Sequence, residues 1–202
     1  MKLSKVVAAA VVLTLTAQVA RAQIQGLPFY PTPTGIGVMV SADYANPDGP
    51  GTVTAIRGGA GFGPFGATAV LGRVSNGSTE NAYGATAAMK LFGGGLTPIT
   101  IGAQVGLGQV KYSYATGSTT VTYMPVGVTA RVSIPLFPLK PFAVGYYTLG
   151  NNIGDKEVRV TAGADMNFLL GLGVHAAYDY GDSGNTWAVG AHFNFRLPVP
   201  VP

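Results

Sequence analysis

The run over residues 187–195 constrains the fold more than any other part of the sequence, because its residues alternate in character at every second position. One face of the run is apolar and carries Trp187, Val189, Ala191, Phe193 and Phe195. The opposite face is small or polar and carries Ala188, Gly190, His192 and Asn194. A period of two residues is typical of a β-strand, and the contrast between the faces predicts that each meets a different environment.

Nine further segments with strand character precede this run, each bounded by clusters of Gly, Pro, Asn, Asp or Ser. The ten expected strands span residues 34–45, 52–61, 65–75, 82–92, 99–114, 119–134, 140–149, 157–168, 172–180 and 186–195. Polar connections alternate along the chain with tight turns that carry hardly any charge. Eight strands are the alternative, if two of the weakly patterned Gly-rich segments are not separate strands.

The first 22 residues have the features of a secretory signal peptide. Lys2 and Lys5 precede an apolar stretch over 6–20, and Ala20-Arg21-Ala22 forms a small-x-small cleavage site. The remaining chain holds nine basic and eight acidic residues and no cysteine. This near-neutral balance gives no electrostatic reason to bind nucleic acid. The absence of cysteine excludes disulfides and thiolate metal sites.

Charged residues make up only 10% of the chain, whereas soluble domains average about 25%. After the signal peptide no apolar run is long enough for a spanning helix, and the apolar residues recur at alternate positions instead. Strands that face lipid produce this pattern. We therefore expect an all-β fold, a closed antiparallel up-and-down transmembrane β-barrel over 34–196, with a Pro-rich arm at 23–33 and a Pro-rich tail at 197–202.

The inward faces of such a barrel are expected to hold a polar network. Its members are Asp43, Arg57, Arg73, Lys90, Arg131, Arg159, Asp165, His175, Asp179, His192 and Arg196. A barrel of eight to ten strands has an interior about as wide as its side chains. Charges of both signs can pair there and leave no wide aqueous channel. The short turn near residue 170 predicts that Asp165 lies opposite His175 and bonds to it.

Aromatic residues are expected to mark the two bilayer interfaces. Tyr and Trp lie near strand ends that meet the polar connections, at Tyr44, Tyr83, Tyr112, Tyr114, Tyr123, Tyr178, Tyr180 and Trp187. Phe lies near the tight turns, at Phe62, Phe65, Phe92, Phe137, Phe168 and Phe195. This separation predicts two girdles, one at each end of the barrel.

Gly190, Phe193 and Phe195 have the spacing of a glycine followed by aromatics three and five residues later. This segment resembles the C-terminal β-signal of outer-membrane barrels. Together with the signal peptide and the alternating strands, the chain resembles the small bacterial outer-membrane β-barrel proteins, a porin-like family. The resemblance implies location in the outer membrane, contact with its lipid bilayer and assembly by the barrel-assembly machinery.

His175 and His192 are the only histidines, and both are expected to face the lumen on neighbouring strands. A metal site or a catalytic dyad is the alternative to a polar network. Two histidines without a third ligand at motif spacing favour the network. No serine is expected in the layer of either histidine, which disfavours a Ser–His lipid hydrolase. The sequence therefore predicts no enzyme activity, no cofactor and no metal.

The preferred function is that of an integral outer-membrane barrel with a structural or minor permeation role and a lumen filled by charged side chains. The alternative is a soluble periplasmic or secreted barrel that binds an apolar ligand and has its apolar faces inside. The few charges on the polar faces disfavour this alternative, because a surface in water carries more Lys and Glu. No residue pattern indicates a transported solute or an oligomeric state.

Overall fold

The computed structural model describes residues 26–48, 51–76, 78–94, 97–114, 117–134, 137–150 and 156–196. Its strands are β1 (Gly37–Pro47), β2 (Thr52–Phe62), β3 (Phe65–Asn76), β4 (Ser78–Gly94), β5 (Thr97–Tyr114), β6 (Gly117–Val132), β7 (Leu139–Gly150), β8 (Glu157–Asn167), β9 (Leu172–Gly181) and β10 (Thr186–Arg196). A 3-10 turn, η1 (Leu169–Gly171), joins β8 to β9. The expected signal peptide and Pro-rich tail lie outside the described residues.

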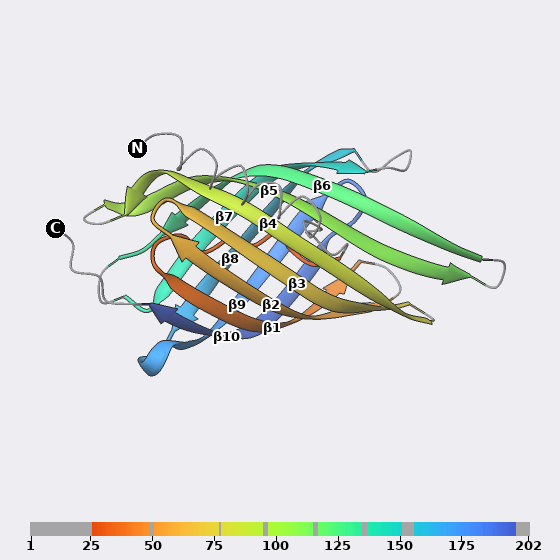
Figure 1. Cartoon of the computed structure of the whole chain (residues 1–202), viewed down its shortest axis with the longest axis horizontal. Coiled ribbons are helices and arrows are strands. Elements are labelled where there is room, and N and C mark those ends of the chain that lie inside the picture. The colour runs from red at the N-terminus through yellow and green to blue at the C-terminus, as the bar shows by residue number, and fades with distance from the viewer. Residues whose placement is uncertain are drawn as a thin grey trace, which may run out of the picture.

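The ten strands form one closed barrel, in which every strand pairs antiparallel with its sequence neighbours and β1 closes on β10 (Figure 1). This confirms the expected fold and the count of ten over eight. Nine strands lie within three residues of their expected bounds, and β4 begins four residues early. Within the described ranges, no helix is long and apolar enough to cross a membrane.

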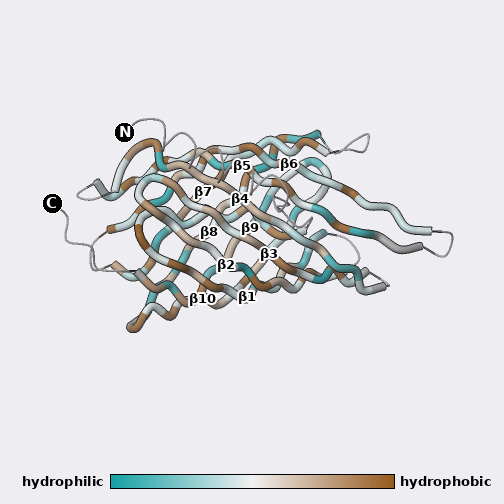
Figure 2. Tube along the Cα trace, viewed as in Figure 1, coloured by the Kyte–Doolittle hydropathy of each residue, from teal (hydrophilic) through white to brown (hydrophobic). Residues whose placement is uncertain are grey.

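The outer face of the barrel is apolar, as the alternation predicts. On β10, Trp187, Val189, Phe193 and Phe195 are all exposed, whereas Ala188 and His192 between them are buried. Figure 2 shows hydrophobic and hydrophilic positions alternating along the strands. The apolar side chains therefore point away from the lumen, the reverse of what a soluble carrier of an apolar ligand requires.

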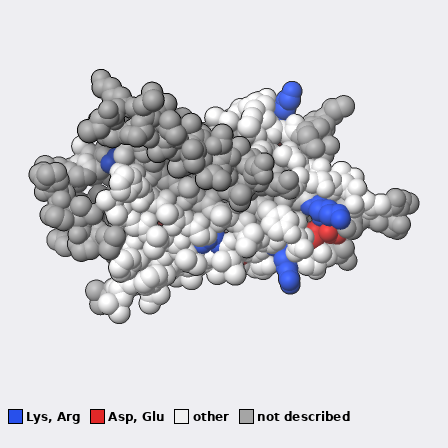
Figure 3. Space-filling view, in the orientation of Figure 1, with Lys and Arg blue, Asp and Glu red and all other residues white. Residues whose placement is uncertain are grey.

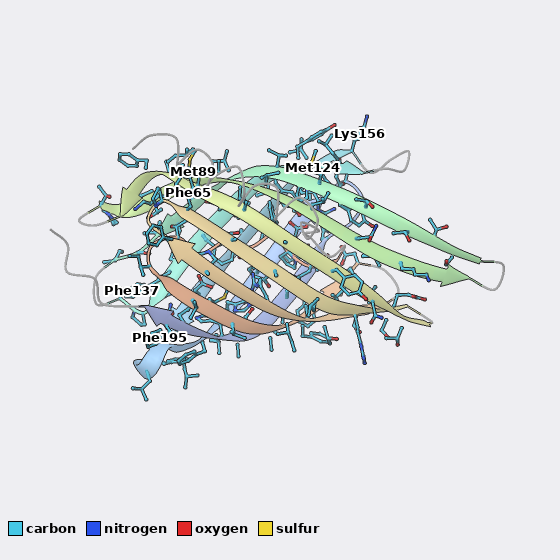
Figure 4. The ribbon with its side chains drawn as sticks, viewed as in Figure 1. Phe65, Met89, Met124, Phe137, Lys156 and Phe195 are labelled. Carbon is cyan, nitrogen blue, oxygen red and sulfur yellow. The ribbon has the colours of Figure 1, made fainter. Side chains whose placement is uncertain are left out.

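Two ends of the barrel can be distinguished by their connections. The turn end carries the tight turns, and Phe65, Phe137 and Phe195 gather there in Figure 4. The polar end carries the polar connections, and most charged side chains on the face in Figure 3 lie toward it. At this end Tyr44 packs on Trp187, with ring centroids 5.7 Å apart.

The aromatic girdles have one exception among the described side chains. Tyr123 is buried, because it faces the lumen rather than the exterior. The side chains of Tyr112 and Tyr114 lie outside the described residues. The other expected girdle residues are exposed: Tyr44, Tyr83, Tyr178, Tyr180, Trp187, Phe62, Phe65, Phe92, Phe137, Phe168 and Phe195.

The hairpin of β5 and β6 is longer than its neighbours. β4 pairs with β5 only as far as Val110, and β7 pairs with β6 only from Tyr123. Beyond these positions the described residues of β5 and β6 pair only with each other, up to Tyr114 opposite Gly117. The hairpin therefore projects past the barrel wall at the polar end (Figure 1).

Candidate functional site in the barrel lumen

A segment before the first strand lies inside the barrel. Residues 26–34, here called the arm, contain Leu27, Phe29 and Tyr30, which are 3–7% exposed. The ring of Phe29 packs edge to face on Tyr146 of β7, with centroids 5.1 Å apart. The ring of Tyr30 packs against Phe142, also on β7, at 6.1 Å. The arm thus buries its apolar side chains against the inner wall.

The backbone of the arm is held by side chains of the wall. The Phe29 amide donates to Thr161 Oγ1 at 3.3 Å. The Thr32 amide donates to Gln104 Oε1 at 3.2 Å, and Gln104 Nε2 donates to the Tyr30 carbonyl at 3.2 Å. The side chain of Gln104 therefore bonds one backbone N–H and one backbone carbonyl of the arm, as the backbone of a neighbouring strand would. The prolines of the arm have no N–H that needs a partner.

Glycines in the wall make room for the arm. A Cβ at Gly66 would overlap the Pro33 carbonyl, and one at Gly59 would lie 3.0 Å from Pro33 Cγ. The arm leaves the lumen at Gly35, whose amide donates to the Gly63 carbonyl at 2.9 Å. This close approach accounts for part of the glycine that weakens the alternation of β2 and β3.

The arm corrects the expected filling of the lumen. Sequence analysis predicts an extended, unpaired arm and an interior filled by charged side chains. The arm indeed pairs with no strand, yet it occupies part of the interior itself. The wall around it is partly apolar and includes Val53, Val70, Val110, Phe142 and Val144. Burial against these residues removes the apolar side chains of the arm from water.

The central cluster consists of Ser41, Asp43, Arg57, His175 and His192 and joins β1, β2, β9 and β10. Arg57 Nη2 donates to Asp43 Oδ1 at 2.9 Å, and Ser41 Oγ donates to Asp43 Oδ2 at 2.9 Å. His175 Nε2 lies 2.5 Å from Asp43 Oδ1. All five side chains belong to buried residues, so the charge of Asp43 is compensated inside the wall.

The central cluster also meets the arm. The Arg57 guanidinium lies over the ring of Tyr30, 4.0 Å from its centroid. The His175 ring approaches Tyr30 edge to face, with centroids 5.0 Å apart. A cation over an aromatic face is attractive, the more so where water is excluded. Tyr30 is therefore the residue of the arm that contacts the side chains of the central cluster.

The polar-end cluster consists of Tyr146, Glu157, Arg159, Thr161 and Asp179. Asp179 Oδ1 accepts from Tyr146 Oη at 2.8 Å and Thr161 Oγ1 at 2.5 Å. Asp179 Oδ2 accepts from Arg159 Nε at 2.7 Å, and Arg159 also pairs with Glu157. Every oxygen of Asp179 therefore has a donor, and the guanidinium lies between two carboxylates.

A third ion pair lies toward the turn end, between Arg131 Nη2 and Asp165 Oδ2 at 2.8 Å. The expected register is confirmed, since Asp165 lies opposite His175 across β8 and β9. The expected bond between them is wrong: the bonded carboxylate of His175 belongs to Asp43. The geometry favours the guanidinium as the partner of Asp165, because it is always charged and directs several donors at a carboxylate.

The structure places nine of the eleven expected network residues on the inner face. They are Asp43, Arg57, Lys90, Arg131, Arg159, Asp165, His175, Asp179 and His192. The side chain of Arg196 lies outside the described residues, although its backbone pairs with Gly37. Lys90 lies apart from the three clusters and reaches toward Gly94.

Arg73 is a correction, because it points outward with Leu71 while Val70 and Val74 face the lumen. A shift of one residue exchanges the faces of a strand, and the weak pattern of β3 hid its phase. Arg73 lies opposite Asn81 next to the polar connections. A long basic side chain is tolerated at that level because its charged end can reach the headgroups.

A second correction concerns serine. Ser41 lies opposite His192 across β1 and β10 and is buried on the inner face. A serine thus shares the histidine layer, contrary to expectation. Its hydroxyl donates to Asp43 and accepts from Arg57 Nε at 3.1 Å, so the described bonds direct it to the ion pair rather than to an imidazole.

The residues of the expected assembly signal also have local roles. Phe193 and Phe195 are exposed on the outer face at the turn end. Gly190 lies opposite His175, and a Cβ there would come within 2.5 Å of His175 Nε2. Glycine at this position is therefore required by the packing of the central cluster. Recognition of the segment by the assembly machinery stays a prediction.

A small cavity adjoins the central cluster on its turn-end side. Its volume is ≈ 60 Å³, and its lining includes Tyr30, Arg131, Asp165, His175 and His192. A second cavity of ≈ 20 Å³ lies between the arm and the wall near Thr68. A water molecule occupies about 30 Å³ of liquid, so each space is of the size of one or two waters.

Comparisons with known proteins identify the fold. No family model matches the chain, and no curated relative matches it. The KdgM porin is 10% identical over 78% of this chain and 99% of its own, with a TM-score of 0.52. A second structure, the KdgM porin in complex with disordered oligogalacturonate, has a TM-score of 0.53 at 11% identity, over 78% of this chain and 99% of its own.

The N-terminal β-barrel domain of Pseudomonas aeruginosa OprF also matches, at 15% identity over 79% of this chain and 97% of its own, with a TM-score of 0.41. At these identities the likeness concerns the fold alone. The chain has the fold of an outer-membrane β-barrel, as the resemblance of its last strand predicts.

Proposed function

We propose that this chain is an integral outer-membrane barrel whose lumen is closed by its own arm, with a structural role and at most minor permeation. The observation that carries the proposal is the burial of Phe29 and Tyr30 against the inner wall. The chain reaches the membrane through its signal peptide and is assembled by the machinery that reads Gly190, Phe193 and Phe195.

The outer surface supports insertion in a bilayer. Large apolar side chains such as Val40, Ile56 and Phe193 are exposed along the strands. A surface of this kind is stable in lipid, where apolar residues face outward in a band between aromatic girdles. In water the same surface would be an aggregation site, because soluble proteins rarely expose large apolar patches.

The interior supports closure. The arm is fixed by ring contacts with Tyr146 and Phe142 and by backbone bonds to Thr161 and Gln104. The two cavities beside it are no larger than one or two waters. We therefore expect a solute to pass this level only if the arm moves.

The charges of the wall do not favour an anionic carbohydrate such as the one in the KdgM porin complex. Arg57, Arg131 and Arg159 are each bonded to a carboxylate of the wall. A solute carboxylate would have to displace that partner from a buried ion pair, which is costly. Closure and a structural role account better for these pairs than transport of an acidic sugar.

Conductance in planar bilayers tests the proposal. The chain that begins at Gln23 is compared with a chain that lacks residues 26–34. We expect the first to conduct little and the deletion to conduct steadily, because removal of the arm joins its volume to the adjacent cavities. Steady conductance of the intact chain, unchanged by the deletion, would contradict closure.

A second variant protects this test against misfolding of the deletion. Phe29→Ala with Tyr30→Ala keeps the arm but removes its two ring anchors, so we expect frequent openings. Phe168→Ala is the matched control, since Phe168 is exposed outside the lumen. Boiled and unboiled samples in SDS gels report whether each barrel is folded.

A further inference from the structure

The two histidines of the chain face each other inside the barrel. His175 of β9 and His192 of β10 are both 5% exposed. Their rings are nearly parallel, with an interplanar angle of 22° and centroids 5.4 Å apart. The two Nδ1 atoms are 3.2 Å apart. Two nitrogens at this distance need a hydrogen or a cation between them.

The opposite nitrogens of both rings meet oxygen atoms. His175 Nε2 lies 2.5 Å from Asp43 Oδ1, which also accepts from Arg57. A carboxylate in an ion pair with a guanidinium is ionised and can only accept. Arg57 Nη2 also lies 3.4 Å from His175 Nε2, but Asp43 Oδ1 is far closer, so His175 Nε2 carries the hydrogen of its bond to Asp43.

The same reasoning applies to the second ring. His192 Nε2 lies 3.3 Å from Asn167 Oδ1, which also accepts from Asn194 Nδ2 at 3.2 Å. His192 Nε2 is therefore a donor as well. A neutral imidazole has one N–H, so when both rings are neutral each presents a bare lone pair at Nδ1. Two lone pairs that point at one another repel unless a cation lies between them.

A third ligand is close. One carboxylate oxygen of Asp165 and one nitrogen of each histidine lie within 4.8 Å of one another. A zinc ion binds imidazole nitrogen at about 2.0–2.1 Å, so two tetrahedral ligands are about 3.4 Å apart. The Nδ1 atoms already have nearly this separation. Asp165 Oδ2 accepts from Arg131 at 2.8 Å, which holds this carboxylate beside the two rings.

We propose that His175, His192 and Asp165 bind one divalent transition-metal ion inside the barrel, of the chemical class of Zn²⁺. Imidazole ligands suit zinc, nickel and copper, whereas calcium and magnesium prefer oxygen ligands. Bonds from Nε2 of a ligating histidine to a carboxylate or carbonyl oxygen are the usual support of such a site. Asp43 and Asn167 supply that support here.

Glycines opposite the two rings shape the site. Gly190 lies opposite His175 and Gly173 lies opposite His192. A Cβ at either position would overlap an imidazole. The adjoining cavity of ≈ 60 Å³ is lined by all three ligands and is large enough for a water as fourth ligand. The wall thus leaves open the space that a metal with its water requires.

The surrounding charges determine which ions bind. The carboxylates of Asp43 and Asp165 are both paired with arginines. The site therefore has little excess negative charge, and its affinity rests on the two imidazoles. This predicts selectivity for Zn²⁺ over Ca²⁺ and Mg²⁺. The third ligand, Asp165, comes from β8 and has no motif spacing to the histidines, which is why the sequence pattern favours a polar network over a metal.

The test uses the folded chain without an affinity tag, in detergent micelles and freed of metal by a chelator. Titration calorimetry with Zn²⁺ is expected to show one ion bound per chain, with no competition from Ca²⁺ or Mg²⁺. Co²⁺ as a spectroscopic probe is expected to give the intense visible bands of four-coordinate cobalt. The chain has no cysteine and no other histidine, so these bands report the proposed site.

Matched variants assign the ligands. His192→Gln and Asp165→Asn are expected to weaken Zn²⁺ binding more than the ~10-fold that loss of a supporting bond costs. Asp182→Asn removes an exposed carboxylate at the polar end and is expected to change nothing.

Four results would overturn the proposal. One is the absence of Zn²⁺ binding by the folded chain. Another is equal binding by the double variant His175→Gln, His192→Gln. If the double variant fails to fold in the boiled–unboiled gel test, the cobalt spectrum of the unmodified chain is the deciding measurement. A weak spectrum of six-coordinate cobalt would contradict the site. ¹⁵N NMR could instead detect a proton shared by the two Nδ1 atoms. If Zn²⁺ leaves that signal unchanged, the proton accounts for their short distance and the metal site is wrong.

Discussion

The central cluster and the polar-end cluster are each built around one buried aspartate with one arginine, yet they differ in how the remaining bonds are used. Around Asp179 the other donors are the hydroxyls of Tyr146 and Thr161, and Thr161 Oγ1 in turn accepts from the Phe29 amide of the arm. Around Asp43 one donor is His175, whose second nitrogen faces His192. The polar-end cluster thus surrounds its carboxylate with hydroxyl and guanidinium donors, whereas the central cluster brings two imidazole nitrogens within 3.2 Å of each other. The first arrangement suits a structural role, and the second suits the proposed metal ion.

The largest expected effect is on the polar-end cluster. Asp179→Ala breaks the ion pair with Arg159, which keeps only Glu157 among its described acidic partners, and takes the acceptor from the Tyr146 and Thr161 hydroxyls. We expect a cost of about 3–5 kcal/mol of unfolding free energy. Urea unfolding of the refolded barrel in lipid vesicles measures this loss. Asp182→Ala, at an exposed position of the next connection, is the control and should have no measurable effect. Similar stability of the two variants would show that the cluster is not structural.

The second largest effect is the loss of stability caused by a charged residue on the outer face of the barrel. Ile56 lies at the middle of β2 and is exposed, while Thr54 lies opposite Arg73 near the polar end. In a bilayer Ile56→Arg should cost about 2–4 kcal/mol, and Thr54→Arg about 0–1 kcal/mol, because the penalty depends on depth. Equal costs in vesicles would argue against a membrane around this face.

A smaller effect tests the space kept for the histidines. Gly190→Ala places a Cβ 2.5 Å from His175 Nε2 and should cost about 1–3 kcal/mol, as overpacking of a filled interior does. Gly58→Ala meets nothing within 4 Å and serves as the matched control. If the unfolding free energies of both variants equal that of the parent, the central cluster is looser than the geometry indicates.

The smallest expected effect concerns the arm. Gln104→Ala removes two hydrogen bonds to the arm and should destabilise the barrel by about 1–2 kcal/mol, because net hydrogen bonds are weak. Its larger consequence is on proteolysis, since a released arm becomes accessible at its backbone. Unchanged protection of residues 26–34 in the variant would mean that the ring contacts alone hold the arm.

The sequence was informative where its period was strong. Alternation at every second position predicted which face of β1, β4 and β10 points outward, because one face meets lipid and the other does not. It failed at Arg73, because the Gly and Ala of β3 gave no contrast between faces. One of these glycines, Gly66, is also the residue whose missing side chain makes room for Pro33 of the arm. The weak alternation of β3 therefore has a structural cause.

The sequence could not predict contacts between side chains of strands that are not joined by one hairpin. The register of one hairpin placed Asp165 opposite His175, but the bonded partner of His175 comes from β1, with β10 between them. The arm has no period, so its position could not be inferred. The one indication in the sequence that the arm is buried is its apolar side chains among the prolines, at Leu27, Phe29 and Tyr30.

The position of the arm is the most direct test of this account. NMR of the folded chain in detergent micelles can detect contacts between the ring protons of Tyr30 and those of Phe142 and His175. The account predicts these contacts, together with slow exchange of the Thr32 amide bonded to Gln104. Narrow arm resonances at random-coil shifts, without contacts to the wall, would contradict a lumen closed by its own chain.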